Sequence, residues 1–168
     1  EGFFQEWRSP SLFIETATSG STGIPKKISI SKQQMIASAL MTGEFLQIKK
    51  GENALLNLSV DTIAGKMMIV RAIVLELNLF VTSLSKNPFE STLNIPQIDF
   101  IALVPYQVDN ILNQHTDELK KIKSIIIGGA ACSEKLIENL KAKGIQAYQT
   151  FGMTETISHI AMRKIGII

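Results

Sequence analysis

Three short stretches of the chain carry residue types suited to binding a polyphosphate and a metal ion. The first, Thr18-Ser-Gly-Ser-Thr-Gly-Ile-Pro-Lys26, combines four hydroxyl side chains, two glycines and a lysine within nine residues. Glycines let backbone N–H groups approach an anion closely, hydroxyls donate hydrogen bonds, and the lysine adds a positive charge. The stretch is not a Walker A loop, because the spacing of that motif is not met. Solvated connections can have the same composition, so this stretch alone does not identify a site.

The second and third stretches are Gly128-Gly-Ala-Ala131 and Phe151-Gly-Met-Thr-Glu155. A carboxylate beside a hydroxyl suits Mg²⁺, which proteins hold through one or two carboxylates together with phosphate oxygens. Thr154 is therefore a candidate for contacting phosphate and Glu155 for holding the ion. The small residues of the second stretch leave room for a flat ring. Phe151 could cover such a ring or pack in the core, and both interpretations stay open.

The elements that must position these stretches alternate along the chain. Strands are predicted at 12–17, 26–31, 54–60, 78–84, 99–104, 123–130 and 145–152, and helices at 31–48, 62–77, 105–122 and 133–144. Continuous β-branched runs indicate strands that are covered on both faces. The alternation predicts one α/β domain over residues 1–168, with a mostly parallel sheet and helices on both faces. Ligands of such sheets bind beyond the carboxyl ends of the strands, where all three stretches are expected to meet.

Local signals place several helix ends. Ser31 and Gln34 have the spacing of a capping box, and a basic and glycine-containing stretch follows the first helix near residue 49. Asp61 or Thr62 can cap the second helix, Ser133 can cap the fourth, and Pro105 suits the first turn of the third.

Bulk composition excludes several classes of function. The chain has 168 residues, 45% of them hydrophobic, and a formal charge of +2, which gives no electrostatic case for nucleic acid. Its apolar runs are too short to span a membrane. One cysteine excludes an internal disulfide, and the two histidines lie far apart, which disfavours a His/Cys metal site. These features favour the cytoplasm, and they leave a homo-oligomer open.

Together, "TSGSTGIPK", "GGAA" and "FGMTE" resemble three signature motifs of the adenylate-forming (AMP-binding) superfamily, in the same order and strand–loop context. This superfamily includes acyl-CoA synthetases, peptide-synthetase adenylation domains and luciferases. The resemblance covers nearly the whole chain and implies part of the large N-terminal domain. "GMTETISHIAMR" is further similar to the o-succinylbenzoate–CoA ligase family of menaquinone biosynthesis.

The resemblance implies an acid–CoA ligase that uses ATP, Mg²⁺ and coenzyme A to convert a carboxylate through an acyl-adenylate into a thioester. It implies catalytic roles for Lys26, Thr154 and Glu155, with Glu155 also the magnesium ligand. The ATP-binding residues that it implies are Thr18, Ser19, Gly20, Ser21, Thr22, Gly23, Lys26, Gly129, Ala130, Ala131, Gln149, Phe151, Gly152 and Thr154.

A substrate with two carboxylates needs further donors. A helix after Glu155 would put His159 on the same face as Glu155, which makes His159 a candidate for holding the second carboxylate. Ser158 and Arg163 are further candidate donors for it. A histidine that merely bonds to backbone is the alternative for His159.

Other functions remain open at this point. They are another acyl- or aryl-CoA synthetase, an adenylation domain that loads a carrier protein, a non-catalytic module that binds a nucleotide or CoA, and a purely structural protein. The chain also departs from the family pattern: it has Phe151 for the usual tyrosine, Gln149 for a frequent asparagine, and Asp61 and Thr62 where many members have an aromatic residue or histidine. The family's catalytic lysine would lie beyond Ile168, so these 168 residues are expected to be an excised fragment that turns over poorly alone.

Overall fold

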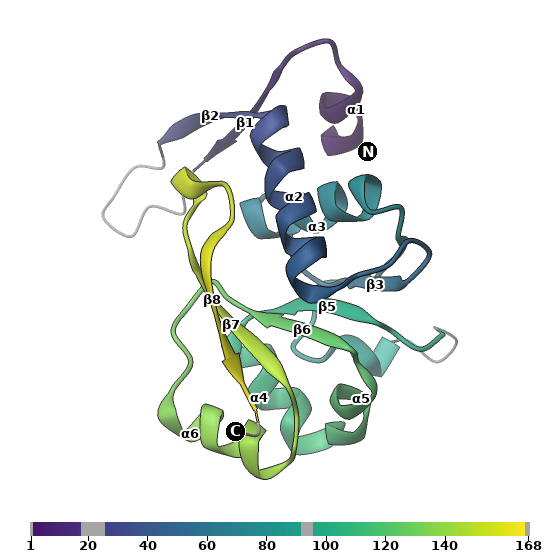
Figure 1. Cartoon of the computed structure of the whole chain (residues 1–168), viewed down its shortest axis with the longest axis vertical. Helices are drawn as coiled ribbons and strands as arrows, with labels where there is room; N and C mark the ends of the chain where they lie inside the picture. Colours follow the sequence, from purple (N-terminus) through teal and green to yellow (C-terminus); the bar gives the residue numbers. More distant parts are fainter. Residues whose placement is uncertain (1, 18–25, 92–95, 167–168) are drawn as a thin grey trace.

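Among the residues that the structure describes, the central sheet has six strands in the order β4-β3-β5-β6-β7-β8 (Figure 1). The computed structural model describes residues 2–17, 26–91 and 96–166. The strands are β3 (Asn53–Leu56), β4 (Asn78–Val81), β5 (Phe100–Leu103), β6 (Ser124–Ile127), β7 (Ala147–Gly152) and β8 (His159–Ile165). Neighbouring strands are parallel except for β8, which is antiparallel to β7. The predicted mostly parallel sheet is confirmed.

Helices cover both faces of this sheet, as predicted (Figure 1). One face carries α2 (Lys32–Leu46) and α3 (Ile63–Val74), and the other carries α4 (Pro105–Gln114), α5 (Thr116–Lys121) and α6 (Glu134–Ala142). The short helix α1 (Gly2–Arg8) lies beside α3, and a 3₁₀ turn, η1 (Pro88–Ser91), follows β4. Among the described residues, no helix is both long and apolar enough to cross a membrane.

Alternate residues of the central strands build two separate cores. Ala54, Leu56, Phe100, Ala102 and Ile126 pack with α2 and α3. The residues that face the other way, Leu55, Ile101, Leu103, Ile125 and Ile127, pack with α4, α5 and α6. Every residue of β5 and β6 is buried, which is why residues 100–103 and 125–127 are continuously apolar rather than alternating.

The first two strands do not join the central sheet. Instead β1 (Phe13–Ala17) and β2 (Lys27–Ser31) pair with each other as an antiparallel hairpin. The prediction that residue 17 ends a strand of the parallel sheet was wrong, because a short connection can join antiparallel strands only. Ala17 pairs with Lys27, so both ends of the intervening segment are held next to each other.

Most predicted helix starts are confirmed. The Thr62 side chain accepts a hydrogen bond from the Gly65 amide at 3.3 Å, and Ser133 accepts one from the Leu136 amide at 3.2 Å. Pro105 is the first residue of α4. Ser31 occupies the cap position of α2, but its side chain makes no capping bond, so the predicted capping box was wrong.

Two helix ends also differ from the prediction. Helix α2 ends at Leu46, and Gln47 takes the left-handed conformation there with φ 52°, so no glycine terminates it. The predicted single helix over 105–122 is interrupted at His115, whose φ of −134° is not helical. The Thr116 hydroxyl donates to the Leu112 carbonyl at 2.7 Å, which satisfies part of the end of α4.

Candidate functional site

The segment after β6 presents small residues at the carboxyl end of the sheet. Gly129 has φ 79°, a conformation that glycine adopts without steric cost. Ala130 and Ala131 are exposed. Beside them, the Thr150 hydroxyl of β7 donates to the Ile127 carbonyl of β6 at 3.1 Å and fixes the two strand ends together. The result is a backbone surface without large side chains, which a planar group could approach.

The end of β7 places an amide and an aromatic ring on one face. Gln149 and Phe151 are two residues apart in the strand, so their side chains point the same way. The Phe151 side chain is 63% exposed, which rules out the core-packing interpretation. Arg163 lies opposite Gln149 on β8 and donates to its Oε1 at 2.6 Å. Arg163 therefore orients the Gln149 amide.

A tight turn joins β7 to β8 and carries Thr154 and Glu155. It contains the 3₁₀ turn η2 (Thr154–Thr156). The Thr156 side chain accepts from the Met153 amide at 3.0 Å and lies 2.8 Å from the Ser158 carbonyl, to which it donates. A side chain at Gly152 would collide with that same carbonyl group. Glu155 is exposed and Thr154 is half-buried.

The helix expected after Glu155 does not form. His159 starts strand β8 instead, so Glu155 and His159 do not share a helix face, and that prediction was wrong. The physical reason is the pairing of residues 159–165 with β7, which supplies ladder hydrogen bonds and buries Ile165.

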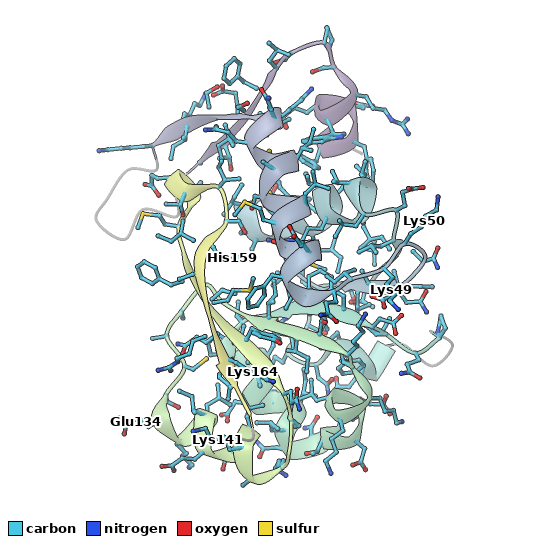
Figure 2. All side chains as sticks on the ribbon, viewed as in Figure 1. Lys49, Lys50, Glu134, Lys141, His159 and Lys164 are labelled. Carbon is cyan, nitrogen blue, oxygen red and sulfur yellow. The ribbon has the colours of Figure 1, made fainter. Side chains whose placement is uncertain are left out.

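A polar network lies where β8 meets α2 and α3, with Arg71 and Thr42 buried and Ser158 and His159 half-buried. The Arg71 guanidinium of α3 donates through Nη2 to Ser158 Oγ at 2.7 Å. Ser158 Oγ is 3.3 Å from His159 Nδ1, and His159 Nε2 is 3.2 Å from Thr42 Oγ1 of α2. Figure 2 shows His159 on β8, on the side where that strand passes α2. Ser158 and His159 are thus brought together, beside an arginine that was not predicted.

Arg71 carries its charge in an unusual environment. Its side chain is 2% exposed, and burial lowers its pKa to about 10. Within the described part of the chain, Arg71 forms no ion pair, and its Nε has no hydrogen-bond partner. A buried charge is normally paired with an opposite charge. Arg71 is therefore a buried cation with at least one hydrogen-bond donor, Nε, that no described residue uses.

Helix α3 links this network to the hairpin. Lys66 Nζ donates to the Glu15 carbonyl of β1 at 2.9 Å and lies 5.9 Å from the centre of the Phe3 ring. Lys66 and Arg71 are five residues apart, which is about 7.5 Å along a helix axis. The strand that leads into residues 18–26 and the residues that follow Glu155 therefore contact the same helix.

Of the first candidate stretch, the structure describes Lys26. Thr18, Ser19, Gly20, Ser21, Thr22 and Gly23 lie outside the described residues. Lys26 is described; it is exposed and directly precedes β2.

The described residues fit a nucleotide and one divalent cation. Glu155 is exposed and takes part in none of the ion pairs within the described ranges. No group of three or more His, Cys, Asp or Glu side chains that could hold a metal occurs in those ranges. A single carboxylate suits Mg²⁺ that is also bound by phosphate, rather than a cation held by protein alone.

Two members of the polar network, Arg71 and Thr42, were missed by sequence reasoning. Arg71 is the one charged residue in "MMIVRAIV", a run that is otherwise apolar. A single charge in such a run indicates a buried polar contact, so Arg71 could have been predicted. Nothing in the sequence distinguishes Thr42 from other polar helix residues, because its contact with His159 spans 117 residues.

Comparison with known proteins gives consistent matches. A family model described as AMP-binding enzyme matches residues 12–166. The chain is 30% identical to 2-succinylbenzoate–CoA ligase of Staphylococcus aureus (strain MSSA476) over 142 residues, which are 84% of this chain and 29% of that protein. The chain thus spans less than a third of the length of this curated relative.

Solved structures resemble the chain over most of its length. One is an acyl-CoA synthetase (AMP-forming)/AMP-acid ligase II-like protein from Dyadobacter fermentans, with 36% identity and a TM-score of 0.88, covering 98% of this chain and 47% of that one. Another is o-succinylbenzoate coenzyme A synthetase from Bacillus subtilis in complex with ATP and magnesium ion. It has 24% identity and a TM-score of 0.80, covering 89% of this chain and 32% of that one, and it shows a shared fold.

Proposed function

Because the chain belongs to the AMP-binding enzyme family, we propose that the protein activates a carboxylic acid with ATP and then transfers the acyl group to coenzyme A. One observation carries the proposal. Small exposed residues after β6, the exposed Phe151 ring near the end of β7 and the exposed Glu155 carboxylate after β7 all lie at the carboxyl ends of two neighbouring parallel strands. This is the edge at which ligands of parallel sheets bind.

Each side chain has a role in this proposal. The backbone of Gly129–Ala131 and the Phe151 ring sandwich the adenine, and the Gln149 amide, held by Arg163, hydrogen-bonds its edge. Thr154 contacts phosphate, Glu155 holds Mg²⁺, and Lys26 with residues 18–23 binds the triphosphate. When bound, the metal ion offsets negative charge that builds on the phosphate oxygens.

We further propose that the acid is an aromatic keto-diacid such as o-succinylbenzoate. The buried Arg71 is the basis for this, since its charge has no carboxylate partner among the described residues. The second carboxylate of such a substrate would supply that partner. The similarity to the 2-succinylbenzoate–CoA ligase of Staphylococcus aureus and the o-succinylbenzoate coenzyme A synthetase of Bacillus subtilis supports this substrate class.

The experiment is ATP–pyrophosphate exchange by the full-length protein with four acids: o-succinylbenzoate, 3-benzoylpropionate, benzoate and a medium-chain fatty acid. 3-Benzoylpropionate lacks one carboxylate of o-succinylbenzoate and is otherwise matched. We expect the highest kcat/KM with o-succinylbenzoate and formation of its CoA thioester. Exchange with another acid only would contradict the substrate, and transfer to a carrier protein instead of CoA would indicate an adenylation domain.

Glu155→Gln tests the metal site. It keeps the size of the side chain and removes the charge, so we expect exchange to fall by about a hundredfold. Glu134→Gln is the matched control, because Glu134 is also exposed but lies in the first turn of α6 (Figure 2). Equal activity of the two variants would contradict the role of Glu155. Binding of ATP without exchange for any acid would indicate a non-catalytic nucleotide-binding module.

A further inference from the structure

In the network around Arg71, the donor and the acceptor of each hydrogen bond follow from the contacts of Thr42, the residue farthest from Arg71. Thr42 is 1% exposed, and its hydroxyl lies 2.8 Å from the Ser38 carbonyl one helical turn earlier. A carbonyl can only accept, so the single hydroxyl hydrogen of Thr42 is used there. Toward His159, the Thr42 oxygen must therefore act as an acceptor.

The proton on the imidazole follows from this. The bond between Thr42 Oγ1 and His159 Nε2 requires a hydrogen on Nε2. In the neutral ring, Nδ1 is then an acceptor, and the Ser158 hydroxyl donates to it across 3.3 Å. Ser158 in turn accepts from the Arg71 guanidinium at 2.7 Å. The order of donation is Arg71 to Ser158 to His159 to Thr42 to the Ser38 carbonyl.

The neutral state of His159 is consistent with its surroundings. Burial and the nearby positive charge of Arg71 lower the pKa of His159 to about 4. A protonated ring would place a second cation beside a guanidinium that has no carboxylate partner within the described ranges. The hydrogen-bond order and the electrostatics thus favour the same protonation state.

This order changes the roles expected for Ser158 and His159. The Ser158 hydrogen is used by His159 and the Nε2 hydrogen by Thr42, so neither side chain can donate to a substrate carboxylate while the chain of bonds is intact. Of these side chains, only Arg71 keeps donors that are not used within the network.

We propose that Thr42 and His159 are positioning residues: by making Ser158 an acceptor, they hold the Arg71 guanidinium toward the second carboxylate of the acid and so set the preference for a diacid. This inference rests on the proposed function, in which Arg71 binds that carboxylate. It predicts that substrate selectivity depends on Thr42 on α2, although among the described residues the Thr42 hydroxyl bonds only to His159 and to the Ser38 carbonyl of its own helix.

The first test reads the tautomer directly in the unmodified full-length protein. Two-dimensional ¹H–¹⁵N NMR of the histidine ring at pH 7 distinguishes a hydrogen on Nε2 from one on Nδ1. We expect the Nε2–H form for His159. The Nδ1–H form, or a doubly protonated ring at pH 7, would overturn the proposal.

The second test uses Thr42→Val, which keeps the shape of the side chain and removes the acceptor, with Thr42→Ser as the conservative variant that keeps it. We expect Thr42→Val to raise the KM for o-succinylbenzoate about five- to tenfold, the effect of losing one hydrogen bond. The KM for 3-benzoylpropionate and for ATP should not change. Thr42→Ser should restore the preference. A general folding defect would instead affect all three KM values and both acids equally, and that outcome also contradicts the proposal.

Arg71→Met separates this inference from the function on which it rests. If Arg71→Met leaves the preference for the diacid unchanged, the proposed role of Arg71 in substrate binding is wrong. If Arg71→Met abolishes the preference but Thr42→Val does not alter it, Arg71 binds the carboxylate and the positioning role of Thr42 and His159 is wrong.

Discussion

Replacing Arg71 with methionine should leave the protein as stable as before or more stable. The lowering of the Arg71 pKa from 12.5 to about 10 by burial corresponds to an unfavourable contribution of about 3 kcal/mol. The favourable contribution is one charge-assisted hydrogen bond to Ser158, of about 1.5–3 kcal/mol. The difference is between zero and roughly 2 kcal/mol in favour of the apolar side chain. Methionine is long and flexible enough to fill most of the vacated space.

Urea unfolding without substrate, followed by circular dichroism, measures this difference. We expect the free energy of unfolding of Arg71→Met to equal that of the wild type or to exceed it by about 1–2 kcal/mol. Lys164→Met is the control: Lys164 is exposed on β8 (Figure 2), and its replacement should change stability by less than about 0.5 kcal/mol.

A large loss of stability in Arg71→Met would contradict this prediction. An arginine in a buried ion pair leaves an uncompensated charge when it is removed, at a cost of about 3–5 kcal/mol. A loss of more than about 2 kcal/mol in Arg71→Met would therefore refute the conclusion that the guanidinium is unpaired in the free protein. Stability that is kept while diacid activation is lost would identify Arg71 as a residue retained for function.

Three further predictions concern stability. Thr62→Ala should lose about 1 kcal/mol in urea unfolding because it removes a capping bond, whereas Ser31→Ala, at a cap without such a bond, should lose less than half of that. Gly152→Ala should lower the melting temperature by several degrees, since the added methyl group collides with the Ser158 carbonyl; an unchanged melting temperature would show that the turn yields freely. The pKa of His159 is lowered from 6.5 to about 4, so between these pH values the unfolded chain binds a proton that the folded chain does not. Stability should therefore fall on the order of 1 kcal/mol as the pH drops through this window, after discounting for the half-exposed ring, and His159→Gln should remove that part of the pH dependence in unfolding curves at pH 4.5 and 7.5.

Features that depend on residues close together in the chain could be predicted from the sequence. Strand β5 and residues 125–127 of β6 are continuous apolar runs, and both strands are buried throughout. The caps at Thr62 and Ser133 depend only on a hydroxyl three residues before a free amide. The three candidate stretches were recognisable because their residue types are unusual within short windows.

Features that depend on distant partners could not be predicted in the same way. The sequence of β8 has weak strand signals, and the strand forms because its backbone pairs with that of β7. The hydrogen bond between Arg71 and Ser158 joins residues 87 apart in the sequence. The hairpin β1–β2 has the strand signals that were predicted, but its separation from the central sheet follows from pairing and not from composition.

The strand order also affects how the protein behaves at high concentration. Of the six sheet strands, β4 and β8 lie at the two ends of the order. β4 has only four residues, and β8 carries two adjacent exposed cations, Arg163 and Lys164. Short and positively charged outer strands disfavour the addition of a strand from another molecule. Among the residues that the structure describes, both outer strands of the sheet thus have a feature that disfavours fibril-like self-association.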